Sequence, residues 1–273
     1  MKPQPITFRD GRQVCPLGQG TYQMGRRRKE EVQALRRGID LGLAVIDTAE
    51  MYGTEDLVGE AVRGCRDEAF IVSKVLPGNA SYEGTKRACE RSLRRLGTDR
   101  IDLYLLHWIG HYPFSETVRA LVELRQEGKI LRWGMSNLDV ADMERILSLP
   151  HGEECAANQV LYNLHDRGIE FDLIPWSAGH RIPVMAYTPL GEGRLKDHRV
   201  LARIAQHHGA TPTQIMLAWM MRTPDVMPIP KAGSADHVEE NARSLAIELT
   251  DEDLREIDRA FPPPTRKIRL AGW

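Results

Sequence analysis

Short apolar runs alternate with longer amphipathic stretches along almost the whole chain of 273 residues. An apolar run of this kind is typical of a strand buried on both faces, and an amphipathic stretch is typical of a helix that covers one face of a sheet. Each run and the stretch that follows it form one strand–helix unit. The eight apolar runs are residues 14–20, 43–49, 69–74, 101–108, 129–137, 155–160, 183–190 and 226–230.

Buried strands separated by helices predict a parallel sheet, because each crossover helix must cover a face of the sheet. Eight units in about 250 residues match the size of a (β/α)8 barrel, an α/β TIM barrel. Apolar and polar residues alternate over residues 6–14 around Asp10-Gly11, which predicts a β-hairpin before the barrel. Stretches 200–209 and 211–223 predict extra helices near the C-terminus. An open, doubly wound sheet stays an alternative, since strand order cannot be read from the sequence.

No Pro/Ser-rich linker and no change of composition divides the chain, so a single domain over residues 1–273 is predicted. A Gly-rich segment near the start resembles a dinucleotide fingerprint, but its glycines are Gly18, Gly20 and Gly25. A Rossmann loop needs the third glycine two residues sooner, so that helix and strand can pack closely. A Rossmann domain is therefore not predicted.

The charge balance bears on which kinds of partner the protein can bind. A formal net charge of -1 and a pI near 6.8 provide no basic field to attract nucleic acid. No run approaches the length of a membrane span, and the start of the chain has no apolar signal region, so a cytoplasmic protein is expected. No conspicuous apolar run is available for docking, and a monomer is predicted. The cysteines are scattered without a C-x-x-C pair, which predicts reduced thiols.

Polar residues close several apolar runs, and in a barrel these positions meet at the catalytic end. Asp47, Lys74 and His107 each follow or end a run, and Tyr52 follows Asp47 in a short loop. Each residue alone has a structural explanation, such as a helix cap for Asp47 or a buried hydrogen bond for His107. Their convergence on adjacent strand ends favours a catalytic site instead. A lysine beside the tyrosine would favour tyrosinate, lower its pKa from about 10 and make it a usable general acid.

The chain resembles the aldo-keto reductase family over nearly its whole length, on the segments IDTAEMYG, VSK, IDLYLLHW, GMSN, NQV, MAYTPLGEG and IPKAGSADHVEEN. Among bacterial members it is most similar to the methylglyoxal reductase branch. The resemblance implies that small aldehydes and 2-oxoaldehydes are reduced to alcohols with NADPH and without a metal. It places the catalytic tetrad at Asp47, Tyr52, Lys74 and His107, with Tyr52 as the proton donor.

The resemblance also implies a cofactor site. Ser136, Asn137 and Gln159 would hold the nicotinamide carboxamide, and Tyr187 would stack on its ring. Other residues would contact the phosphates, the adenosine end or the rim of the site. These residues are Gly20, Thr21, Asp47, Leu190, Gly191, Lys231, Ser234, His237, Glu240 and Asn241.

Two departures from the family concern the 2′-phosphate of NADPH. The family commonly has Ser or Thr after the lysine of IPK and an arginine six residues after that lysine. Here the positions are Ala232 and His237. An arginine fork donates two charged hydrogen bonds to a phosphate, whereas a histidine donates at most one. Because Lys231 keeps a positive charge there, NADPH is predicted, with NADH use possible.

The substrate pocket is expected to involve Tyr22, where many members carry tryptophan, and Trp108. Only FPPPTRKIRLAGW follows Ala260, too little for the long C-terminal loop of larger members of the family, which predicts a more open, smaller pocket than theirs.

Two other functions are compatible with a barrel. One is metal-assisted hydrolysis through His107 and His111, which lacks an obvious third ligand. The other is a cofactor-binding redox sensor or regulatory subunit with weak turnover.

Overall fold

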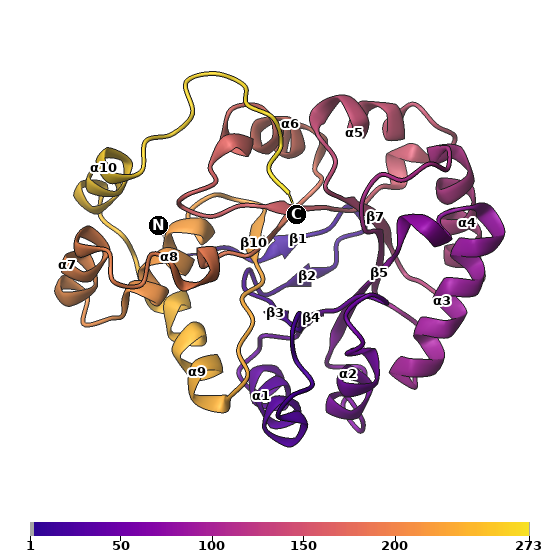
Figure 1. Ribbon diagram of the computed structural model, residues 1–273, viewed down its shortest axis with the longest axis horizontal. Helices are drawn as coiled ribbons and strands as arrows, with labels where there is room; N and C mark the ends of the chain where they lie inside the picture. The colour runs from indigo at the N-terminus through magenta and orange to yellow at the C-terminus, as the bar shows by residue number, and fades with distance from the viewer. Residues whose placement is uncertain (1–2, 273) are drawn as a thin grey trace.

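The computed structural model describes residues 3–272 and contains a closed barrel of parallel strands (Figure 1). Neighbouring strands follow chain order, and the barrel closes where Gly20 pairs in parallel with Lys231. The predicted (β/α)8 fold is confirmed, and the open sheet is wrong. The strands are β3 (Gln19–Gly20), β4 (Val45–Asp47), β5 (Phe70–Val75), β6 (Leu103–Leu106), β7 (Trp133–Ser136), β8 (Asn158–Leu161), β9 (Val184–Tyr187) and β10 (Val226–Pro228).

Helices surround the barrel (Figure 1). The α-helices are α1 (Arg28–Asp40), α2 (Glu55–Ala61), α3 (Tyr82–Leu96), α4 (Phe114–Gln126), α5 (Val140–Leu147), α6 (Leu173–His180), α7 (Arg199–His207), α8 (Pro212–Met221), α9 (Ala235–Arg243) and α10 (Asp251–Ala260). Short 3-10 turns are η1 (Pro77–Asn79), η2 (Gly152–Glu154), η3 (Gly168–Glu170), η4 (Gly191–Gly193) and η5 (Ser244–Ala246). Within residues 3–272, no helix has the length and apolar character to cross a bilayer.

The predicted hairpin is present as β1 (Ile6–Thr7) and β2 (Gln13–Val14). Ile6 and Phe8 pack against Val45, Phe70 and other residues near the starts of the barrel strands. The Phe8 and Phe70 rings stack with centroids 5.2 Å apart. The hairpin therefore covers the N-terminal end of the barrel and leaves the C-terminal ends of the strands for a site.

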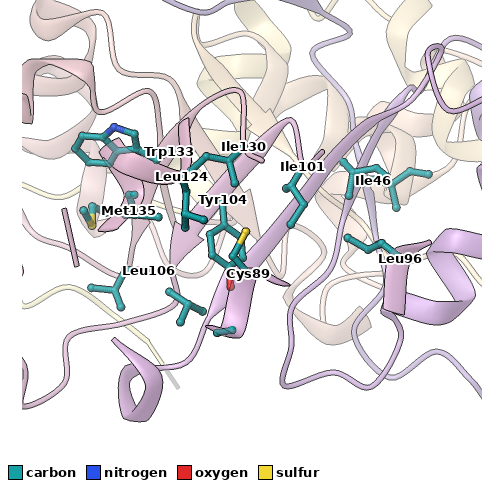
Figure 2. Packing of buried hydrophobic residues seen from close by; sticks show 14 of the residues in the cluster. Ile46, Cys89, Leu96, Ile101, Tyr104, Leu106, Leu124, Ile130, Trp133 and Met135 are labelled. Atoms are coloured by element: carbon teal, nitrogen blue, oxygen red, sulfur yellow. The ribbon is translucent and has the colours of Figure 1, made fainter. Parts of the chain in front are cut away.

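The space between the strands and the outer helices is filled by large apolar side chains (Figure 2). Trp133 of β7 and Tyr104 of β6 are fully buried there, together with Cys89 of α3 and Leu124 of α4. Strand β5 is buried at all six positions, as expected for a strand covered on both faces. This layer holds the strand ends at fixed positions.

The barrel seam requires a glycine at position 20. The amide groups of Gly18 and Gly20 donate to the carbonyl oxygens of Pro228 and Pro230, each at 3.0 Å. A Cβ atom on Gly20 would lie 2.8 Å from the carbonyl oxygen of Ile229, closer than packed atoms approach. Gly20 therefore allows the first and last strands to meet.

Candidate active site

The four residues of the predicted tetrad come from neighbouring parts of the barrel rim. Asp47 ends β4, Lys74 is the fifth residue of β5, and His107 directly follows β6. Tyr52 lies in the turn between β4 and α2. Pairing of β4 with β5 and of β5 with β6 places these strand ends side by side. The structure thus brings together residues that are far apart in the sequence.

Asp47 and Lys74 form a buried ion pair. The Lys74 Nζ atom lies 2.7 Å from Asp47 Oδ1 and also donates to the carbonyl oxygen of Thr48 at 2.8 Å. The other carboxylate oxygen of Asp47 accepts from the Gln159 side chain at 2.7 Å. Burial is the largest influence and lowers the pKa of Lys74, but the charges and hydrogen bonds of Asp47 and Tyr52 together outweigh it, so that the net pKa is raised. Lys74 is therefore a fixed positive charge.

The Tyr52 hydroxyl lies between two tetrad members. It is 3.4 Å from Lys74 Nζ and 3.5 Å from His107 Nε2. Burial raises the pKa of Tyr52 above its usual value near 10, and the Lys74 charge only partly opposes this effect. The predicted lowering of the Tyr52 pKa is therefore wrong, because burial disfavours the anion more than one lysine favours it. Tyr52 holds its proton at neutral pH.

His107 is neutral in this setting. Burial, followed by the Lys74 charge, lowers the pKa of His107 from its usual 6.5 to about 3. A neutral imidazole carries one N–H group, so His107 offers a single donor and a single acceptor. His107 can hydrogen-bond an oxygen without competing with Tyr52 as a strong acid.

The buried neutral His107 predicts a specific acid sensitivity. Below about pH 6.5 the unfolded chain gains a proton at this side chain, whereas the folded chain gains it only near pH 3. Stability should therefore fall as pH drops through this window. A His107→Asn variant is expected to lose less stability than wild type between pH 7 and pH 4.5. Melting temperatures across this range measure the difference, and parallel curves for the two proteins would contradict the assignment.

A row of aromatic rings extends from the tetrad. The Tyr22 and Tyr52 ring centroids are 5.1 Å apart, and those of His107 and Trp108 are 4.7 Å apart. Both predicted pocket residues, Tyr22 and Trp108, line a cavity of about 930 Å³ at the barrel mouth. Met51 and Ile109 also line it, although sequence reasoning missed them. Their positions beside Tyr52 and Trp108 on the strand-end loops were the available signal.

The residues predicted to hold the nicotinamide line the same cavity. The Asn137 side chain donates to the carbonyl oxygen of His107 at 3.0 Å and accepts from the Tyr187 hydroxyl at 2.8 Å. Its amide also donates to Ser136 Oγ at 3.2 Å. Because the Gln159 amide nitrogen donates to Asp47, the Gln159 oxygen is the atom that it can offer a ligand. This network fixes Tyr187 beside the tetrad.

Gly20 and Thr21 also line the cavity. The Thr21 hydroxyl donates to the carbonyl oxygen of Asp47 at 2.9 Å, so Thr21 holds the β4 end in place. Leu190 lines the cavity as well, whereas Gly191, the first residue of η4, has φ of 53° and is not among the lining residues. Their predicted contact with a pyrophosphate stays a prediction.

Of the residues predicted to bind the adenosine phosphate, the structure places only some at the cavity. Lys231 lines the cavity, whereas the other four lie beyond it on or before α9. Ser234 caps α9 by accepting from the His237 amide at 3.4 Å. Glu240 accepts from the Thr211 hydroxyl at 2.7 Å, and Asn241 is buried. Glu240 thus already accepts a hydrogen bond from Thr211, the N-cap residue of α8.

The C-terminal segment returns to the cavity, which sequence reasoning missed. Figure 1 shows it running from α10 to the centre of the helix ring. Residues 269–272 line the cavity, and Lys267 bonds Asp139 and Asp172 at 3.1 and 2.9 Å. The tail is thus long enough to reach the barrel mouth, since about nine extended residues span roughly 30 Å, and the pocket that is more open than in larger relatives stays a prediction.

The metal alternative finds no support in the side-chain arrangement. His111 is exposed and its ring packs on Tyr112, with centroids 4.1 Å apart. Among residues 3–272, the histidine, cysteine and acidic side chains close enough to share an ion are His151, Glu153 and Glu154, outside the cavity. His107 thus has no third ligand of the kind that catalytic zinc requires.

The fold and the site define an oxidoreductase barrel, with a protonated phenol beside a fixed ammonium group at its mouth. A sequence profile of the aldo/keto reductase family matches residues 16–261. The chain belongs to the aldo/keto reductase family.

Individual relatives cover almost the same length. Methylglyoxal reductase YeaE of Escherichia coli is 49% identical, over 99% of both chains. Glyoxal reductase of Bacillus subtilis is 34% identical, over 93% of this chain and 91% of the relative. The crystal structure of an aldo/keto reductase from Klebsiella pneumoniae, in complex with NADP and acetate, has a TM-score of 0.96 and 51% identity. It covers 98% of this chain and 99% of that chain.

Proposed function

We propose that this protein reduces small aldehydes and 2-oxoaldehydes such as methylglyoxal to alcohols with NADPH. The observation that carries the proposal is the Tyr52 hydroxyl, placed between Lys74 Nζ and His107 Nε2 at the mouth of a large cavity. The similarity to methylglyoxal reductase YeaE supports the substrate class.

The residues of this chain support a proton-donation mechanism. In the proposed mechanism, Tyr52 gives its proton to the carbonyl oxygen, since an alkoxide is a much stronger base than tyrosinate. Lys74 stabilises the tyrosinate that remains, and Asp47 holds Lys74 in place. Neutral His107 hydrogen-bonds the same oxygen and orients it, which stabilises charge that develops in the transition state. A bound NADPH supplies the hydride.

The cavity residues fit this cofactor. A volume of about 930 Å³ lies within the range of cofactor sites, and the lining combines apolar surface with a few polar groups. Tyr187 offers a ring face, and Ser136 and Gln159 offer polar atoms to an amide. With the nicotinamide at Tyr187, the phosphates would pass Leu190 and Lys231, on the side of the barrel seam.

Rates on two aldehydes with two cofactors test the proposal. We expect turnover of methylglyoxal and of benzaldehyde, with NADPH used more efficiently than NADH. Exposed Tyr22, Met51, Trp108 and Ile109 form an apolar rim beside Tyr52 and predict a lower KM for the aromatic aldehyde. Tight NADPH binding with negligible turnover of both aldehydes would instead favour the redox-sensor function.

We propose that residues 1–273 act as one domain, as a monomer, in the cytoplasm. Light scattering of the purified protein checks the oligomeric state, and a second copy at working concentrations would contradict a monomer.

A further inference from the structure

The basic run at residues 26–29 is not explained by the barrel or by the tetrad. Arg28 pairs with Asp56 and Glu60 of α2 at 2.8 and 2.9 Å, so its charge stabilises the contact between helices. Arg27, the residue before α1, points in another direction. Its guanidinium group lies near Gly233, in the loop between β10 and α9.

Arg27 and Lys231 meet at Gly233. The Arg27 Nη2 atom would lie 3.5 Å from a Cβ atom built on Gly233, and the Lys231 Nζ atom would lie 3.4 Å from it. The two cationic groups are therefore no farther apart than the sum of these distances. Two positive charges so close repel each other, and a phosphate dianion between them would remove that repulsion.

The surrounding groups leave this pair of charges available. Arg27 pairs with Glu30 at 2.8 Å through Nη1, and both side chains are 58% exposed, so water weakens that pair. Near Gly233 in the sequence, the first turn of α9 carries a second exposed acid, Asp236. Glu31 is buried and accepts from the Gly25 amide at 2.7 Å, which fixes the loop that carries Arg27.

We propose that Arg27, together with Lys231, binds the 2′-phosphate of NADPH and replaces the arginine that is His237 in this chain. The proposal rests on the proposed use of NADPH. Lys231 lines the cavity, and Gly233 lies two residues after it and two residues before Ala235, the first residue of α9, where backbone N–H groups favour an anion. Arg27 brings a guanidinium group from the loop between β3 and α1 to the same place.

The function of Arg27 has a clear consequence for cofactor choice. A guanidinium group donates charged hydrogen bonds to a phosphate but gains nothing from the 2′-hydroxyl of NADH. Arg27 therefore separates NADPH from NADH, although the family's usual arginine position holds His237. The chain keeps NADPH preference by means of a residue about 200 positions earlier in the sequence.

Binding measurements on an Arg27→Gln variant test this proposal. The Kd values of NADPH and of 2′,5′-ADP are expected to rise about tenfold, while those of NADH and 5′-AMP change less than about twofold. Arg27→Lys should recover part of the loss. Arg63→Gln, which removes an exposed positive charge beyond the C-terminal end of α2, is the matched control and should change none of the four values.

The outcomes separate this proposal from the proposed function. Unchanged Kd values in Arg27→Gln, or equal increases for NADPH and NADH, would overturn the function of Arg27 while wild-type turnover with NADPH stays intact. A wild-type protein that neither turns over aldehydes with NADPH nor binds 2′,5′-ADP more tightly than 5′-AMP would overturn the proposed function itself.

Discussion

A Tyr52→Phe variant is expected to lose carbonyl reduction, with kcat lower by roughly 10²- to 10⁴-fold, the contribution typical of a general acid. The substitution removes only the hydroxyl that lies 3.4 Å from Lys74 Nζ and 3.5 Å from His107 Nε2. The ring and its packing on Tyr22 remain. Binding of NADPH, measured by quenching of protein fluorescence, should be nearly unchanged.

Tyr22→Phe is the matched control for this experiment. Tyr22 lines the same cavity and loses the same atom, but it does not belong to the hydrogen-bonded tetrad. We expect it to keep most of its kcat. A Tyr52→Phe variant that retained most of its kcat would show that another group donates the proton.

A Lys74→Met variant is expected to lose both activity and stability. Removing the ammonium group leaves the Asp47 carboxylate buried without its partner, which costs on the order of 3–5 kcal/mol in the free energy of unfolding. Catalysis should fall as well, because no positive charge remains to stabilise tyrosinate. Urea unfolding and steady-state rates measure the two effects separately.

The double variant Asp47→Asn/Lys74→Met separates charge from packing. With both charges removed, we expect a large part of the lost stability to return, since no unpaired charge stays buried. Activity should stay low. A double variant as unstable as Lys74→Met alone would mean that the ion pair is not the origin of the instability.

The barrel could be predicted from the sequence because each strand is a continuous apolar run. All eight runs overlap a strand, although β3 is only two residues long and β5 and β8 each extend one residue past their runs. Helix α10 was missed, even though Thr250 and Asp253 form a capping box at its start. Its many charged residues gave a weaker pattern than the apolar runs did.

The site was predictable where strand ends converge and unpredictable where burial or long-range contacts decide. The tetrad positions follow from adjacent strands, but the raised Tyr52 pKa depends on how much water the folded loops exclude. The path of residues 261–272 depends on contacts such as Lys267 with Asp172, which no local pattern encodes. The approach of Arg27 and Lys231 to the same glycine, Gly233, likewise depends on a long-range contact.

The barrel seam has a consequence for folding. At the seam, the backbone bonds from Gly18 and Gly20 to Pro228 and Pro230 link residues more than 200 positions apart, so joining these edges carries a large chain-entropy cost. Gly20 and Lys231 both border the cavity, so a dinucleotide there would span the join. By contacting both edges, such a ligand would stabilise the closed barrel, whose two edges are synthesised first and last.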